Sequence, residues 1–246
     1  GGLTTRAADK ITDASALSVA SGATLTLGGA ETVGSIDGAG NIVNGGFTVT
    51  AGGANTNTTY SGVISGAGGL TKMGSGTLTL SGTNTYTGAT TISAGGLTTS
   101  AADKITDASA LSVASGATLT LGGAETVGSI AGAGNIVNGG FTVTAGGANT
   151  NTTYSGVLSG AGGLTKTGSG TLTLSGTNTY TGATTLSGGG ITTSGADKVA
   201  DGSAVSVGSG TTLTLGGAET VGSIDGAGNI VNGGFTLTAG GANTNT

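Results

Sequence analysis

The sequence predicts an all-β fold, a parallel β-helix (β-solenoid) in which short strands stack coil upon coil. Leu alternates with Thr at Thr77–Leu80 and again at Thr171–Leu174, a period of two that is typical of strands with one buried face. Glycine makes up 56 of the 246 residues and separates these segments, which permits tight bends. No segment has the 3.6-residue period of an amphipathic helix over ten residues.

A 94-residue repeat organises the chain. Residues 1–94 and 95–188 are two full copies, and residues 189–246 are a partial third copy. We therefore expect one continuous solenoid, a segment of a longer array, rather than separate globular domains. The first two copies differ only at the pairs Arg6/Ser100, Asp37/Ala131, Ile64/Leu158, Met73/Thr167, Ile92/Leu186 and Ala94/Gly188.

Similar strand-like segments recur within the repeat and predict the length of a coil. They open at Leu70, Leu97, Leu119, Phe141 and Leu164, at steps of 27, 22, 22 and 23 residues. These steps predict about 22–27 residues per coil, about four coils in each 94-residue unit and roughly ten coils in the chain. With stacked strands ~4.8 Å apart, one unit would advance ~19 Å.

The strands of the first unit follow from the same alternation. Gly- and Asn-rich segments between them are typical of turns. Residues 8–16 have apolar spacing too poor for a helix, so we expect a longer loop at a corner there. The predicted strands are 16–20, 23–27, 32–36, 41–43, 47–50, 59–64, 70–72, 77–80 and 89–93.

The exchanges between copies predict which side chains face inward. Ile64 is Leu158 in the second copy, and Ile92 is Leu186, as expected of buried positions where volume is kept. Met73 is replaced by Thr167, so this side chain should point outward. One coil alone buries too little apolar surface to be stable, whereas a stack of coils shares one core.

One long motif resembles a known family. Residues 68–97 read GGLTKMGSGTLTLSGTNTYTGATTISAGGL and return at 162–191 with few changes. The order of Gly, Leu, Thr, Asn and Tyr resembles the passenger-associated repeat of bacterial autotransporters, the proteins of type V secretion. The resemblance implies a right-handed parallel β-helix that is secreted or displayed on the bacterial cell surface. It also implies that the signal peptide and the outer-membrane anchor lie outside this chain, and it implies no reaction.

Composition excludes several other classes. The net charge is −5 with no basic cluster, which argues against a nucleic-acid partner. No run of 18 apolar residues is present, and the absence of cysteine excludes disulfides and thiolate metal sites. A flexible low-complexity linker is the alternative for so much glycine, but the regular alternation of Leu, Ile and Val favours an ordered fold.

Acidic residues are the candidates for catalysis, because glycoside hydrolysis needs two carboxylates across a cleft. Three copies, no Trp and no His argue against one catalytic cleft, so we expect solvated loop charges, no enzyme, no catalytic residue and no cofactor. The recurring carboxylates are Asp9, Asp13 and Glu31, then Asp103, Asp107 and Glu125, then Asp197, Asp201 and Glu219.

Calcium binding is a second possibility. Residues 35–46, SIDGAGNIVNGG, faintly resemble the calcium-binding repeats of secreted β-rolls, but Asp37 becomes Ala131 in the second copy. We therefore expect no metal there. Asp9 and Asp13 stay open as a pair of hard oxygen ligands at one corner.

Polar and aromatic side chains of the motif have mainly structural interpretations. We expect Asn55, Asn57, Asn84 and Asn178 to stack or to bond turn backbone, and the tyrosines Tyr60, Tyr86, Tyr154 and Tyr180 to pack at corners rather than to bind glycans. An ice-binding surface would need Thr-x-Thr pairs in register on every coil, and pairs such as Thr24/Thr26 recur at irregular steps. An isopeptide crosslink through Lys72 or Lys166 would need a buried partner acid.

These observations favour a structural function over a binding or catalytic one. The first hypothesis is a stalk or fibre segment that 94-residue units lengthen, because a rod needs identical units whereas a single active site needs a unique one. The alternative is an adhesin or autoaggregation module that binds surface glycans or sibling chains through repeated weak contacts. A β-helical polysaccharide hydrolase is the third. Expected partners are adjacent repeats, and identical chains in a fibre.

Overall fold

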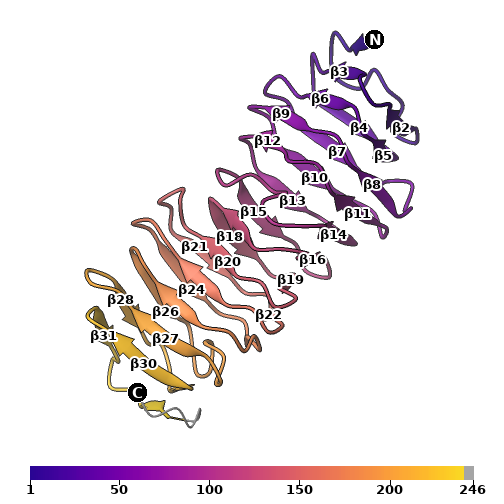
Figure 1. Ribbon diagram of the computed structural model, residues 1–246. Helices are drawn as coiled ribbons and strands as arrows, with labels where there is room; N and C mark the ends of the chain where they lie inside the picture. Colours follow the sequence, from indigo (N-terminus) through magenta and orange to yellow (C-terminus); the bar gives the residue numbers. More distant parts are fainter. Residues whose placement is uncertain (241–246) are drawn as a thin grey trace.

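The structure is a computed structural model that describes residues 1–240; the last six residues of the partial third copy lie outside them. It is a straight rod of stacked coils that runs from the first strands of the chain at one end to the last described strands at the other (Figure 1). The described residues contain strands and no helix, and therefore no helix that is long and apolar enough to cross a membrane. The predicted parallel β-helix is confirmed, with about 12 coils instead of roughly ten.

Short parallel strands form three long faces of the rod, which we call the first, second and third face. The third face is one eleven-stranded sheet that runs unbroken along most of the chain. Its strands, in spatial order, are β4 (Glu31–Val33), β7 (Val49–Ala51), β10 (Leu70–Lys72), β13 (Thr90–Ile92), β15 (Ala110–Val113), β18 (Ser129–Gly132), β21 (Thr152–Tyr154), β24 (Thr171–Leu174), β26 (Gly190–Thr193), β28 (Thr212–Thr214) and β31 (Asn229–Val231).

The other two faces are each divided into two sheets. The first face holds β1 (Gly2–Thr4), β3 (Thr24–Thr26), β6 (Asn41–Val43), β9 (Ile64–Gly66) and β12 (Thr85–Tyr86), then β17 (Glu125–Val127), β20 (Val143–Ala145), β23 (Leu164–Lys166), β25 (Thr184–Leu186), β27 (Ala204–Val207) and β30 (Ser223–Gly226). The second face holds β2 (Ala16–Val19), β5 (Ser35–Gly38), β8 (Thr58–Tyr60), β11 (Thr77–Leu80), β14 (Gly96–Thr99), β16 (Thr118–Thr120), β19 (Asn135–Val137) and β22 (Leu158–Ser159), then β29 (Glu219–Val221) and β32 (Leu237–Ala239).

Coils are shorter than the sequence spacing predicted. Paired residues of neighbouring coils lie 17 to 22 positions apart, for example Thr24 with Asn41 and Leu97 with Leu119. The step of 22 residues from Leu97 to Leu119 is one coil, but the longest predicted step was wrong because it compared segments of different faces. Leu70 lies on the third face and Leu97 on the second, so the step between them is not one coil.

The 94-residue unit does not contain a whole number of coils. Residues 1–94 hold the thirteen strands β1 to β13. The loop before β2 takes the place of one further strand on a face of the rod, and there Ile11 packs against the core. Fourteen positions on three faces make four and two-thirds coils, rather than the four that we predicted. Successive units are therefore related by a third of a turn and an advance of ~22 Å along the axis.

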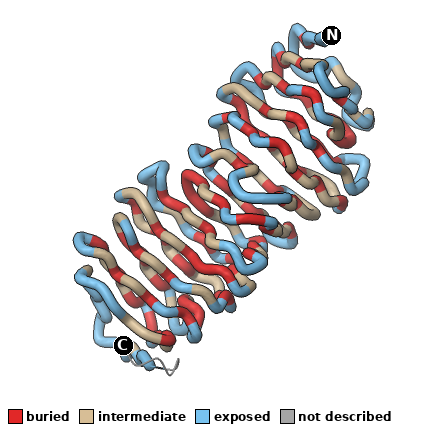
Figure 2. Tube along the Cα trace, viewed as in Figure 1, coloured by how far each residue is buried: buried red, intermediate tan, exposed pale blue. Residues whose placement is uncertain are grey.

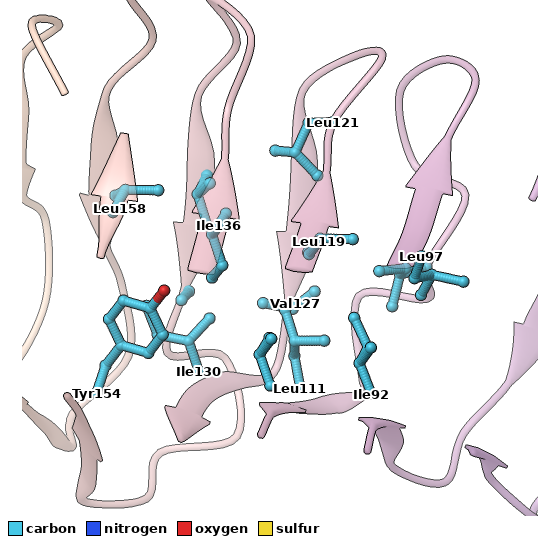
Figure 3. Close-up of a cluster of buried hydrophobic side chains, with 14 of the residues drawn as sticks. Ile92, Leu97, Leu111, Leu119, Leu121, Val127, Ile130, Ile136, Tyr154 and Leu158 are labelled. Carbon is cyan, nitrogen blue, oxygen red and sulfur yellow. The ribbon is translucent and has the colours of Figure 1, made fainter. Parts of the chain in front are cut away.

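A single core runs through the centre of the rod. Leu97, Leu119, Ile136 and Leu158 lie in register on four successive coils of the second face, and all are buried (Figure 3). Buried and half-buried residues alternate along many of the strands between the two ends of the rod (Figure 2). Each such side chain contributes roughly 1.5–3 kcal/mol on burial. The inward positions predicted for Ile64 and Ile92 are confirmed.

Some strand boundaries differ from the prediction, and glycine explains one of them. Residues 32–36 were expected to be one strand, but the chain turns at Gly34 between β4 and β5. A Cβ at Gly34 would lie 2.6 Å from the carbonyl oxygen of Ala14 in the preceding coil, so only glycine fits this corner. Residues 59–64 are divided in the same way, and Phe47 precedes its strand instead of opening it.

Candidate functional site

The predicted acidic residues separate into two groups. Asp9 and Asp13, like their equivalents in the other copies, are exposed on the corner loop, as expected. The three glutamates are buried: Glu31 and Glu125 are 2% exposed and Glu219 is 1% exposed. The prediction of solvated charges was therefore wrong for the glutamates. Within residues 1–240, no three Asp, Glu, His or Cys side chains gather in a group that could hold a metal.

Each buried glutamate holds the corner loop of its unit. In the second unit, the backbone N–H of Lys104 donates to Glu125 Oε1 at 2.9 Å, and that of Ile105 donates to Oε2 at 3.1 Å. Burial raises the pKa of Glu125 to about 7, while these two hydrogen bonds and one from Thr99 oppose the shift and the charge of Asp103 adds to it. The carboxylate thus replaces the strand partner that the loop lacks.

The carboxylates of the third unit lie in two different environments. In the third unit, Asp197 and Asp201 line a groove of about 460 Å³ together with Thr177 and Thr179. The carboxylate of Glu219 is held by the backbone N–H groups of its own loop, as in the second unit. The adjacent Tyr180 is 1% exposed, so its ring offers no platform for a sugar.

Lys72 and Lys166 point into the rod, a placement that our interpretation of the motif missed. Their alternation with Leu70 and Leu164 was the signal, because the second residue after an inward Leu also faces inward. Lys72 is 1% exposed, and its Nζ donates to the carbonyl oxygens of Met73 at 2.6 Å, Gly74 at 2.9 Å and Ala94 at 3.4 Å. Burial lowers the pKa of Lys72. Within the part of the chain that the structure describes, its hydrogen-bond partners are all backbone carbonyls, and none is the carboxyl group that an isopeptide crosslink needs.

Asparagines bond the backbone of neighbouring coils, a structural role as predicted but with different partners. Asn84 is buried; its Oδ1 accepts the N–H of Ile64 at 2.9 Å and its Nδ2 donates to the carbonyl of Lys104 at 2.7 Å. It therefore joins three coils. On the surface, Asn55 Oδ1 accepts the N–H of the next coil's Ser75, and Asn57 that of Thr77.

Asn44 and Asn138 are buried asparagines that we did not single out from the sequence. Asn44 Oδ1 accepts the N–H of Gly68 at 2.9 Å, and Asn138 Oδ1 accepts that of Gly162 at the same distance. Their Nδ2 atoms have no hydrogen-bond partner among the described residues. Position alone, before two glycines at a corner, was the available signal.

The aromatic residues divide by type. All four tyrosines are buried, as predicted, and their hydroxyls bond within the rod: Tyr60 donates to the carbonyl of Gly40 at 2.6 Å. The phenylalanines Phe47 and Phe141 are each 39% exposed, and Phe235 is 42% exposed. Because successive units are rotated, these three rings lie at three different corners of the rod.

Threonines form columns on the outer surface. Threonines that recur at irregular steps in the sequence lie in register on neighbouring coils, because the turns between the strands differ in length. On the second face, for example, Thr79 lies between Thr59 and Thr98 of the neighbouring coils. A second column beside it is interrupted, since Thr77 pairs with Gly96. The surface therefore lacks the two continuous columns that an ice-binding array requires.

Comparison with known proteins identifies the motif. A model of the passenger-associated-transport-repeat matches residues 70–98 and 164–192, the two segments that carried the resemblance. No curated protein and no solved structure matches the chain. Each match spans β10 to β14 or β23 to β26, which are successive positions of the solenoid on all three faces. With two of these repeats in a parallel β-solenoid, the chain fits an autotransporter passenger β-helix, a family that is secreted or displayed on the cell surface.

Proposed function

We propose that this chain is a segment of a structural stalk or fibre of a bacterial cell-surface protein, lengthened by 94-residue units. The observation that carries the proposal is the eleven-stranded third face, a hydrogen-bonded ladder from Glu31 to Val231 that passes through all three copies without a break. A continuous ladder over a continuous core resists bending. The proposal assigns no reaction and no cofactor to the chain.

The repeat is suited to this role because strand pairing continues from one unit into the next. Although each unit ends two-thirds of the way round a coil, the strand positions of the next unit continue the same three faces. For example, Ser112 of β15 in the second unit pairs with Thr91 of β13 in the first. Copying one unit therefore adds length, and it leaves every interface between coils unchanged in kind.

Changing the number of units tests the proposal. Deleting residues 95–188 should shorten the rod by ~22 Å in electron micrographs, and duplicating them should lengthen it by the same amount. Deleting residues 95–150 is the control, because it does not end at an equivalent position and should disrupt the coils at the junction. A compact particle, or one whose length does not follow the number of units, would contradict the stalk.

Adhesion or autoaggregation is the second candidate function. The outward columns of threonine and the exposed phenylalanines favour it, since they repeat at regular intervals around the rod. Many weak contacts of this kind would add through multivalency. A glycan array and an aggregation assay with cells that display the chain test this function; binding to neither would remove it.

A further inference from the structure

The third face carries a column of ten outward side chains without a charge, and nine of the ten have a hydroxyl group. Strand pairing places its members side by side on ten successive coils from β4 to β28 (Figure 1). None of these side chains is buried. We call this set the threonine column: Thr32, Thr50, Thr71, Thr91, Ser112, Ala131, Thr153, Thr173, Thr192 and Thr214.

The threonine column differs from its equivalents on the other faces in charge. On the second face Ser18 is followed by Asp37, and on the first face Ser206 is followed by Asp225. On the third face the residue at this place, beside Ser112, is Ala131. The rotation between units brings the three copies of this position to three different faces. Because Ala131 stands where the first copy has Asp37, the threonine column contains no charged side chain.

We propose that the threonine column is a contact surface for a second copy of this chain, which lies against it side by side. Among possible partners, a second solenoid has the same spacing of ~4.8 Å between rungs, so hydroxyls and methyls can meet along the whole column. Ala131 removes the desolvation penalty that a carboxylate would bring to such a contact. The proposal rests on the proposed rod, since only an extended chain presents the column in line.

The size of the column indicates a weak contact. Ten rungs span ~43 Å, and three residues of strand span ~10 Å, so each rod would cover ~430 Å². The total of ~860 Å² is below the 1,200–2,000 Å² or so of stable interfaces, in the range of transient ones. Pairing should therefore depend on concentration for this chain, and it should strengthen where rods are held close together on a surface.

Two matched substitutions on the full chain test the contact. Ala131→Asp places a carboxylate in the column, and because Asp37 and Asp225 are native at this position the variant should fold. Ala102→Asp adds the same charge to an exposed loop and serves as the control. We expect sedimentation velocity to show concentration-dependent pairing of the unchanged chain and of Ala102→Asp, and pairing at least about tenfold weaker for Ala131→Asp.

Asp37→Ala extends the test to the second face. It leaves an uncharged column there from Ser18 to Ser159, so this variant should associate more strongly than the unchanged chain. Small-angle scattering distinguishes a side-by-side pair, which doubles the cross-section, from end-to-end joining, which doubles the length. Extended rods that stay single, or that pair equally well with Ala131→Asp, overturn the proposal and leave the stalk intact. Compact particles would overturn the stalk itself.

Discussion

Leu3 and Leu97 occupy the same place in two copies of the repeat, yet they lie on different faces of the rod. Leu3 pairs with Leu25 on the first face, whereas Leu97 lies between Leu78 and Leu119 on the second. The difference arises because fourteen strand positions do not divide evenly among three faces. The array is thus a threefold screw, in which the same side of the rod recurs at every third unit.

The screw predicts the axial repeat of a longer array. In a tandem array of the 94-residue unit, electron microscopy with helical averaging should give a rise of ~22 Å with a rotation of a third of a turn. The same view should recur only after ~67 Å, which corresponds to fourteen coils. An array that repeats at ~19 Å without rotation would have four coils per unit and would contradict the strand pairing.

Asn84 should contribute strongly to the stability of the rod, because its side chain joins neighbouring coils. Asn84→Ala removes one bond to Ile64 N–H and one to the Lys104 carbonyl, and it leaves both backbone groups without a partner. We expect a loss of about 2–4 kcal/mol in the free energy of unfolding. Urea denaturation followed by circular dichroism measures it.

Asn57→Ala is the matched control for this prediction. Asn57 is exposed and makes one bond, from the N–H of Thr77, so its loss should reduce stability by no more than about 1.5 kcal/mol. Equal effects of the two substitutions would mean that the contact of Asn84 with the loop at Lys104 contributes nothing.

The buried Glu125 predicts that stability falls as pH rises. Its folded pKa of about 7 lies above the ordinary value of 4.5, so the folded state binds the proton more tightly than the unfolded state. The contribution is fully present below about pH 4.5 and is lost as pH rises through 7. Between pH 5 and 8, urea denaturation should show a decrease of about 1–3 kcal/mol from this residue.

Substitution separates Glu125 from other titrating groups. Glu125→Gln should flatten the pH dependence, whatever it does to stability at a single pH. Asp107→Asn removes a charge from the exposed part of the same loop and should leave the slope that Glu125 causes in place. Stability that increases with pH over this range, or an unchanged slope in Glu125→Gln, would contradict the buried carboxylate.

Local alternation predicted β11, in which a hydrophobic residue stands at every second place, to the residue, and it predicted the bounds of β10 equally well although Lys72 takes its second inward place. Contacts between coils were beyond the sequence for a physical reason. Nothing in the pattern around Glu31 shows that its carboxylate meets the N–H groups of Lys10 and Ile11, about one coil earlier. The number of residues per coil was not predicted correctly either. Turns of several lengths separate the strands, so strands that pair on one face do not recur at a constant spacing in the sequence.

Glycine at one corner of the rod predicts a large loss of stability from a single added methyl group. Gly40, Gly62 and Gly82 lie on successive coils, and a Cβ at Gly82 would lie 1.9 Å from the carbonyl oxygen of Gly62. A Cβ at Gly62 would lie 1.7 Å from that of Gly40. Gly82→Ala must therefore push two coils apart, at a cost of about 3 kcal/mol or more.

Gly53→Ala shows whether this loss is steric or conformational. The nearest atom to a Cβ at Gly53 is the carbonyl oxygen of Asp13 at 3.9 Å, so the methyl group has room. Alanine there should leave stability unchanged or raise it by up to about 1 kcal/mol, since it restricts the unfolded chain. Thermal denaturation of both variants decides the matter. If Gly82→Ala is as stable as Gly53→Ala, the coils do not stack as closely at this corner as the structure indicates, and glycine serves there only as a flexible joint.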